Sequence, residues 1–153
     1  MNVLKAVGLP ALLMTVSLSA MAGDPVALFG DLDPLHPQKL TKEQAEQLLT
    51  GAKMTRVTPA GSTHLWTNEP GGAFIISTDN RGRVATSTLV QSTSTSGNWH
   101  ISPEGKYCVT IEWKKLPTED WCRYVFKTDD GYYFSRTDQN RAEKVFRYEV
   151  NGK

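Results

Sequence analysis

The residues best suited to chemistry are two histidines, each close to a tryptophan in the sequence. In a strand, His64 and Trp66 share one face, whereas Trp99 and His100 point to opposite faces, because successive side chains alternate. A titratable ring beside a large aromatic ring can bury apolar area and direct a hydrogen bond. We therefore predict that any ligand is bound around His64, Trp66, Trp99 and His100. A structural role in the core is the alternative for the same residues.

Motifs of familiar enzyme classes are absent from the sequence, which lacks G-x-S-x-G, H-E-x-x-H, a glycine-rich phosphate loop and C-x-x-C. Acidic residues mostly lie in turns such as TDNRG and KTDDG, where aspartate bonds its own backbone. We therefore predict a non-catalytic binding module, either an inhibitor of an envelope enzyme or a carrier of a small ligand, with no cofactor and no metal. The alternative is a hydrolase whose site uses His64, His100 and a turn carboxylate.

The first 22 residues have the layout of a secretory signal peptide. The basic residue Lys5 precedes an uncharged, mostly apolar run, and Ala20, Met21 and Ala22 form an A-x-A cleavage motif. An uncleaved membrane anchor is the alternative, because the segment approaches the ~20 residues that span a bilayer. Pro10 and the lack of a basic flank favour cleavage. We therefore predict cleavage after Ala22 and a mature protein that is periplasmic or secreted.

Residues 1–22 are thus the expected signal peptide, and residues 23–153 have the size of one domain with one core. Cleavage removes one of 17 basic residues and none of 16 acidic residues, so the formal net charge falls from +1 to zero. A neutral domain lacks the basic surface that nucleic acid or anionic lipid requires. We expect a single β-rich domain whose partner is an envelope protein or a small ligand, with no nucleic acid and no membrane. The oligomeric state stays open.

Cys108 and Cys122 are the two cysteines of the chain, and an exported protein meets an oxidising compartment in which they can pair. Buried reduced thiols are the alternative, and the spacing does not suit zinc. We therefore predict a disulfide between Cys108 and Cys122. Closing so short a loop is worth roughly 3 kcal/mol of stability.

A hairpin that places the two cysteines opposite each other puts Val109 opposite Trp121 and Lys106 opposite Tyr124. The disulfide then lies on the face that Val109 and Trp121 do not occupy. Tyr124 and Phe126 share the cysteine face, so this side of the second strand is also apolar. Either the fold is apolar on both sides here, or a β-bulge near Trp121 shifts the register.

The segment LTKEQAEQLLTGAKM predicts a short amphipathic helix over residues 42–50. Thr41 suits the N-cap, Gln44 completes a capping box, and Gly51 can take the left-handed conformation that ends a helix. We expect the helix to pack on its own domain rather than to bind a partner. Residues 23–39 contain several prolines and predict an extended lead-in. The apolar face of the helix consists of Ala45, Leu48, Leu49 and Ala52.

From Lys53 on, short runs rich in β-branched and aromatic residues alternate with turn clusters. This pattern predicts a mainly β fold, an antiparallel meander forming a small barrel or sandwich with one N-terminal amphipathic helix. A barrel is the more economical, because closure removes unpaired edges. Trp113 and Trp121 are expected in the core, and residues 86–96, mostly Ser and Thr, are expected to be partly a mobile loop. The expected strands are 53–57, 63–67, 73–77, 84–90, 98–102, 106–114, 121–127, 132–136 and 143–150.

The succession of the helix, L-L-T-G-A-K, G-x-W, E-G-K-Y-C, W-C-R-Y and D-G-Y-Y resembles a family of small exported proteobacterial proteins grouped as a domain of unknown function, with two cysteines flanking a tryptophan-rich hairpin. The resemblance covers roughly residues 40–136. It implies export and a β-rich fold, and it brings no catalytic residue. The residues that carry it are Gly51, Gly97, Trp99, Gly105, Cys108, Cys122 and Gly131.

Overall fold

The computed structural model describes residues 27–59, 61–79, 93–114 and 117–152, most of which lie in antiparallel strands. The strands β1 (Ala27–Leu28) and β2 (Gln38–Lys39) flank a 3-10 helix, η1 (Phe29–Leu35), and are followed by α1 (Lys42–Leu49). The other strands are β3 (Lys53–Val57), β4 (Thr63–Thr67), β5 (Ala73–Thr78), β6 (Thr93–Ile101), β7 (Tyr107–Ile111), β8 (Glu119–Thr128), β9 (Gly131–Ser135) and β10 (Lys144–Asn151).

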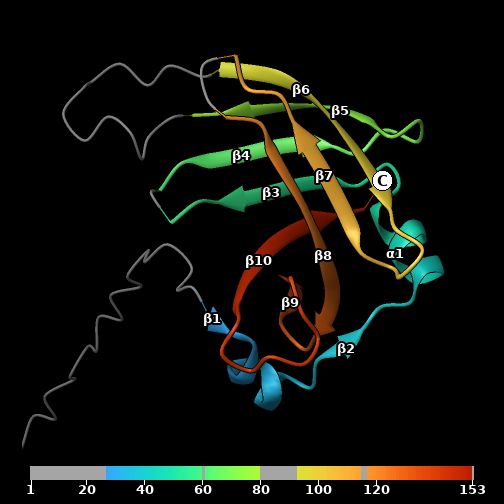
Figure 1. The fold of residues 1–153 in the computed structure, drawn as a ribbon, viewed down its shortest axis with the longest axis vertical. Helices are drawn as coiled ribbons and strands as arrows, with labels where there is room; N and C mark the ends of the chain where they lie inside the picture. Colours follow the sequence, from blue (N-terminus) through green and yellow to red (C-terminus); the bar gives the residue numbers. More distant parts are fainter. Residues whose placement is uncertain (1–26, 60, 80–92, 115–116, 153) are drawn as a thin grey trace, which may run out of the picture.

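Eight of these strands close into a ring. From β3 to β8, each strand pairs antiparallel with the strand that follows it in the sequence, so the series ends with the β8–β9 pair. The last strand, β10, pairs with β9 and with β3, which completes the circle. Figure 1 shows β7 and β8 crossing β3 and β4 at a steep angle. The predicted fold class is confirmed: a closed eight-stranded antiparallel β-barrel, with β1 and β2 as additional strands.

The predicted strand bounds agree with the observed ones to different degrees. Both β3 and β4 have the predicted bounds, whereas β7 ends earlier than predicted. Residues 86–92 of the segment expected to be partly a loop lie outside the described residues, whereas residues 93–96 form the first part of β6, which begins earlier than the predicted 98. Pairing with β5 satisfies their backbone groups, and threonine suits a strand even where little is buried. The predicted strand 84–90 and the predicted signal peptide lie outside the described residues.

The extended lead-in is wrong over η1, where the chain makes a 3-10 turn. The backbone N–H of Leu28 donates a hydrogen bond to Oδ2 of Asp31 at 2.9 Å, which caps the start of the turn. Leu32 is buried in a small cluster with Tyr133 and Val145. The local cap and the burial of Leu32 together favour the turn over an extended chain.

Helix α1 begins as predicted and packs on its own domain. Oγ1 of Thr41 accepts a hydrogen bond from the backbone N–H of Gln44 at 3.3 Å, and Oε1 of Gln44 accepts one from the backbone N–H of Thr41 at 2.9 Å. Gly51 follows in the left-handed region with φ 76°. Its N–H donates to the carbonyl of Asn68 at 2.7 Å, and Leu49 is fully buried in the main core. The helix therefore covers the barrel end at which β4 ends.

Aromatic side chains fill the barrel. Phe134 and Tyr148 stack with ring centroids 4.3 Å apart, and Tyr107 meets Phe134 edge-on at 5.9 Å. Trp121 contacts Tyr107 at 5.8 Å and Tyr148 at 6.3 Å. Trp113 packs against the same core and is partly exposed. The prediction that Trp113 and Trp121 contribute to the core is confirmed.

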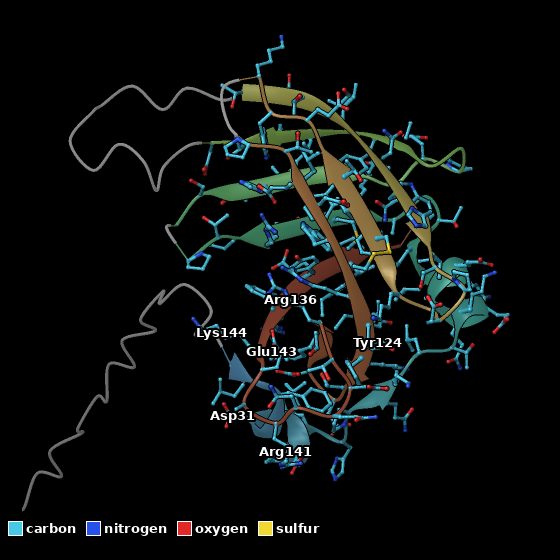
Figure 2. All side chains as sticks on the ribbon, viewed as in Figure 1. Asp31, Tyr124, Arg136, Arg141, Glu143 and Lys144 are labelled. Carbon is cyan, nitrogen blue, oxygen red and sulfur yellow. A yellow bond between two sulfur atoms is a disulfide. The ribbon has the colours of Figure 1, made fainter. Side chains whose placement is uncertain are left out.

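The disulfide between Cys108 and Cys122 is present and joins β7 to β8. Figure 2 shows it as a yellow bond beside β7. Val109 is opposite Trp121, as predicted for this register. The five residue pairs that join β7 and β8 are consecutive, so the alternative of a bulge near Trp121 is wrong.

The barrel is instead apolar on both sides of β8. On the outer face, the ring of Phe126 is buried against Phe29 of η1, with centroids 5.0 Å apart. The Tyr124 ring lies beneath two ammonium groups, Nζ of Lys39 at 5.0 Å and Nζ of Lys106 at 4.8 Å. The N-terminal segment therefore covers the apolar outer face that made the register ambiguous.

Candidate binding site

The four residues predicted to bind a ligand do not lie on the same side of the barrel wall. His64, Trp66 and Trp99 point inward and are buried, with 7%, 5% and 7% of their surface exposed. His100 is exposed, and its Cα partner is Cys108, so it shares the outer face with the disulfide. The structure therefore brings three of the four residues into the interior and leaves His100 outside.

Trp66 and Trp99 belong to the packed part of the barrel near α1. Nε1 of Trp66 donates to Oδ1 of Asn68 and to the hydroxyl of Tyr107, each at 3.1 Å. Nε1 of Trp99 donates to the carbonyl of Glu69 at 3.0 Å. Both indole N–H groups are thus used inside the protein. The binding role predicted for these tryptophans stays a prediction, and their contacts are those of core residues.

His64 belongs to a polar cluster at the opposite end, where β3, β5 and β7 end. Nη2 of Arg56 lies 3.1 Å from Nδ1 of His64 and 3.6 Å from Oε2 of Glu119. Nε1 of Trp113 donates to Oε1 of Glu119 at 3.0 Å. The rings of His64 and Trp113 are 5.6 Å apart. We call these four residues, Arg56, His64, Trp113 and Glu119, the mouth cluster.

A second guanidinium lies deeper, beneath the mouth cluster. Arg123 is only 5% exposed, and its Cζ lies 4.3 Å from the ring centroid of Trp121 and 4.1 Å from that of Phe146. Nη1 of Arg123 donates to the hydroxyl of Tyr148 at 2.5 Å. Nη1 of Arg56 donates to the same hydroxyl at 3.4 Å. Two cations from β3 and β8 therefore meet at one phenol inside the barrel.

The two guanidiniums differ in their electrostatic surroundings. Burial is the main cause that lowers the pKa of Arg123, and the charges of Arg56 and Arg136 lower it further. Arg136 follows β9 and lies near β10 (Figure 2). Burial also disfavours the charge of Arg56, but Tyr148 and Glu119 outweigh it and raise the pKa of Arg56. Arginine stays protonated in proteins, so this end of the barrel holds two cations, of which Arg123 is buried and Arg56 is partly exposed.

Arg56 and Arg123 were not among the predicted site residues, although the alternation of strand side chains contains a signal for both. Arg56 shares a strand face with Met54, and Arg123 shares one with Trp121 and Val125. An arginine among inward-facing apolar residues is unusual, because charged side chains are rarely buried without a partner. That contrast is the feature from which both residues could have been singled out.

A separate groove of about 780 Å³ lies on the outer surface over β3 to β6. Two apolar side chains beside it, Leu65 and Ile75, are 50% and 72% exposed. Of the four predicted binding residues, only Trp66 contributes to its lining. The lining has as many apolar as polar side chains, and the polar ones are Lys53, Thr55, Thr67, Glu69, Ser96 and Asn98. The groove is therefore distinct from the mouth cluster.

Two further findings concern the described part of the chain alone. Within it, His, Cys, Asp and Glu side chains nowhere gather in a group of three or more that could hold a metal ion. The helices found there are too short or too polar to cross a membrane.

Comparison with known proteins identifies a family. No curated protein and no solved structure matches the chain significantly. The sequence model of one family matches residues 26–150, a range that includes every strand of the barrel except the last residue of β10. The chain therefore belongs to the family described as "Protein of unknown function (DUF995)".

Proposed function

We propose that the protein is an exported, non-catalytic binding module that carries a small ligand at the barrel end formed by the mouth cluster. The observation that carries this proposal is a set of charged groups on the inside of the barrel wall: Arg56, Arg123 and Glu119. Burying charges is costly, so a core that needed only stability is better built from apolar side chains. An eight-stranded barrel is wide enough for its own side chains or one small ligand.

The carrier form has more support than the inhibitor form. An inhibitor of an envelope enzyme acts through its outer surface, and there the exposed apolar side chains Leu65 and Ile75 line a groove with as many polar as apolar side chains. Single exposed apolar residues are common on soluble proteins. The mouth cluster, in contrast, combines charge, aromatic rings and partial exposure at one place.

The hydrolase alternative has less support. Its two histidines, His64 and His100, lie on opposite sides of the barrel wall. Arginine can only donate hydrogen bonds, so Nδ1 of His64 accepts from Arg56 and a neutral ring carries its hydrogen on Nε2. In this tautomer neither ring nitrogen is available to act as a general base.

Native mass spectrometry of the full chain, recovered from the envelope fraction of a host that expresses it with its own N-terminus, tests the proposal. We expect a bound small molecule that is released on unfolding. His64→Leu should lose it, whereas His100→Leu should keep it, because the two histidines lie on opposite faces. The intact mass should correspond to cleavage after Ala22. A ligand-free wild-type protein would contradict the carrier function, and a retained Met1 would contradict export.

A further inference from the structure

We infer that the ligand bound at this end of the barrel is a small organic monocarboxylate, held by the guanidiniums of Arg123 and Arg56. This inference rests on the proposed carrier function and adds the chemical class of the ligand. It is drawn from the hydrogen-bond donors, the charges and the aromatic walls of the interior.

Three buried donors at this end have no hydrogen-bond acceptor among the described residues: Nε of Arg56, Nε of Arg123 and Nε1 of Trp121. Buried polar groups in native proteins are nearly always paired, so each such group requires an explanation. All three atoms are donors. A ligand that satisfies them must therefore present acceptor oxygens.

These donors belong to side chains that contact one another. The guanidinium of Arg123 stacks on the ring of Trp121, with Cζ 4.3 Å from the ring centroid. Both arginines donate to the hydroxyl of Tyr148, and the Trp121 ring meets Tyr148 edge-on. The donors therefore belong to one connected group of side chains around the Tyr148 hydroxyl, which suits a single compact acceptor group.

The charge balance favours one negative charge. Glu119 lies within 4 Å of Arg56, whereas Arg123 makes no such ion pair with a carboxylate in the described part of the chain. Arg123 instead donates to the hydroxyl of Tyr148. Arg136, whose charge also acts on Arg123, is exposed to solvent, which screens it. The buried guanidinium of Arg123, the partly buried one of Arg56 and one carboxylate therefore leave one positive charge inside the barrel uncompensated, and an uncompensated buried ion is strongly unfavourable. A bound monoanion brings the net charge of this group to zero, whereas a bound phosphate dianion would make the net charge negative.

Shape and polarity favour an organic carboxylate. A carboxylate matches the planar fork of a guanidinium and can accept two parallel hydrogen bonds from it. Aromatic rings flank the charged groups: Trp121 and Phe146 lie beside Arg123, and Trp113 lies beside Glu119. These rings provide apolar walls for the organic part of the ligand. The partly exposed Trp113 and Glu119 give the direction of entry.

Titration of the full chain with benzoate, benzamide and inorganic phosphate, followed by tryptophan fluorescence, tests the inference. Benzamide has nearly the shape of benzoate and no charge. We expect benzoate to bind at least tenfold more tightly than either of the other probes. We expect its binding to quench fluorescence, because Trp113 and Trp121 lie at the site.

Arg123→Met is the decisive variant. We expect benzoate to bind at least tenfold more weakly, with a melting temperature equal to or above that of the wild type, because apolar replacement of a buried ion is often neutral or stabilising. The matched control is Arg147→Met on the exposed face of β10, which should bind benzoate normally. If Arg123→Met melts early, Arg123→Lys keeps the charge without the fork and should still bind at least tenfold more weakly.

Several outcomes would overturn the inference. Equal affinity for benzoate and benzamide would exclude a charge requirement but leave the carrier function in place. Tighter binding of phosphate than of benzoate would indicate that the ligand is an inorganic oxyanion and not an organic carboxylate. Normal benzoate binding by both Arg123 variants, or no binding of any probe, would also reject it. The carrier function itself fails only if native mass spectrometry finds the wild-type protein without a ligand.

Discussion

Tyr107 donates its hydroxyl hydrogen to Oδ1 of Asn68 at 2.8 Å, and both side chains are fully buried. Nε1 of Trp66 lies 3.1 Å from each of these two oxygen atoms. Nδ2 of Asn68 donates to the carbonyl of Leu49 at 3.1 Å, which ties the end of α1 to the barrel. Burial raises the pKa of Tyr107, so the phenol keeps its proton as a donor. A satisfied buried network of this kind favours one arrangement of helix and barrel.

Removal of the Tyr107 hydroxyl should therefore destabilise the protein. We expect Tyr107→Phe to lower the free energy of unfolding by about 1–3 kcal/mol, because buried partners lose a hydrogen bond. Urea unfolding at fixed pH measures the change. The control is Tyr124→Phe on the outer face, whose ring keeps its contacts with Lys39 and Lys106 and which should cost less. Identical unfolding midpoints for Tyr107→Phe and the wild type would contradict the importance of the network.

Trp66 and Trp99 should behave as core residues. Replacing either by alanine removes a buried ring and is expected to cost on the order of 3–5 kcal/mol. Ile75→Ala is the comparison, because that side chain is 72% exposed and should change stability little. Thermal melts give the result directly. If both tryptophan variants kept the wild-type melting temperature and lost ligand binding, the two rings would instead belong to the binding site.

Gly97 is required by close packing across β6. A Cβ at this position would lie 2.2 Å from Cζ of Phe74 and 2.9 Å from the carbonyl oxygen of Thr110. We expect Gly97→Ala to cost about 1–3 kcal/mol, because the core must shift to admit the methyl group. Gly71→Ala is the matched control, since nothing lies within 4 Å of its added Cβ. Equal unfolding free energies for the two variants would show that Phe74 moves freely.

The disulfide should contribute measurably to stability. It closes a loop with a sequence separation of 14, and we expect the double variant Cys108→Ala, Cys122→Ala to lose roughly 3 kcal/mol. Chemical denaturation with and without reductant gives the same comparison for the wild-type chain. In the native protein without reductant, thiol reagents should leave both cysteines unmodified. Stoichiometric labelling of the two thiols under those conditions would be incompatible with the bond.

Asp130 should make stability depend on pH in the acid range. The hydroxyl of Thr128 donates to its carboxylate at 2.7 Å and, with the hydroxyl of Tyr133 and the charge of Arg147, holds the pKa of Asp130 below its ordinary value of 3.8. Because the folded pKa is lowered, this stabilisation is fully present above the unfolded pKa and is lost as pH falls through the folded pKa.

The variant Asp130→Asn lacks this titration. Urea unfolding of both proteins at several pH values between about 6 and 2 should show the wild type more stable at the upper end, with the difference shrinking as the pH falls below the ordinary aspartate pKa of 3.8. A difference that stays constant across the range would show that the lowered pKa of Asp130 does not contribute to folding.

Local rules were sufficient for several elements of this protein. The capping pair Thr41 and Gln44 and the left-handed Gly51 determined where α1 begins and ends, because caps involve residues only a few positions apart. The alternation of side chains placed the strands, and the pairing of Cys108 with Cys122 defined the register of one hairpin. Each of these features depends on neighbours in the sequence or on one covalent bond.

Other features depend on contacts between distant segments. The sequence indicated that His64 and Trp66 share a face, but only closure of the ring by β10 and β3 decided that this face is the interior. Likewise, the apolar side of β8 is covered by Phe29, which precedes Phe126 by almost a hundred residues. Strand periodicity is symmetrical between the two faces of a strand, so it cannot by itself distinguish inside from outside.

The candidate site belongs entirely to this second group. Arg56 on β3, Arg123 on β8 and Tyr148 on β10 come together because the barrel joins its first and last strands. Pattern reasoning treats an isolated arginine in a strand as a surface residue, since charged side chains are rarely buried. The sequence determined which residues alternate along each strand, and tertiary closure alone decided that two of these cations share one buried phenol.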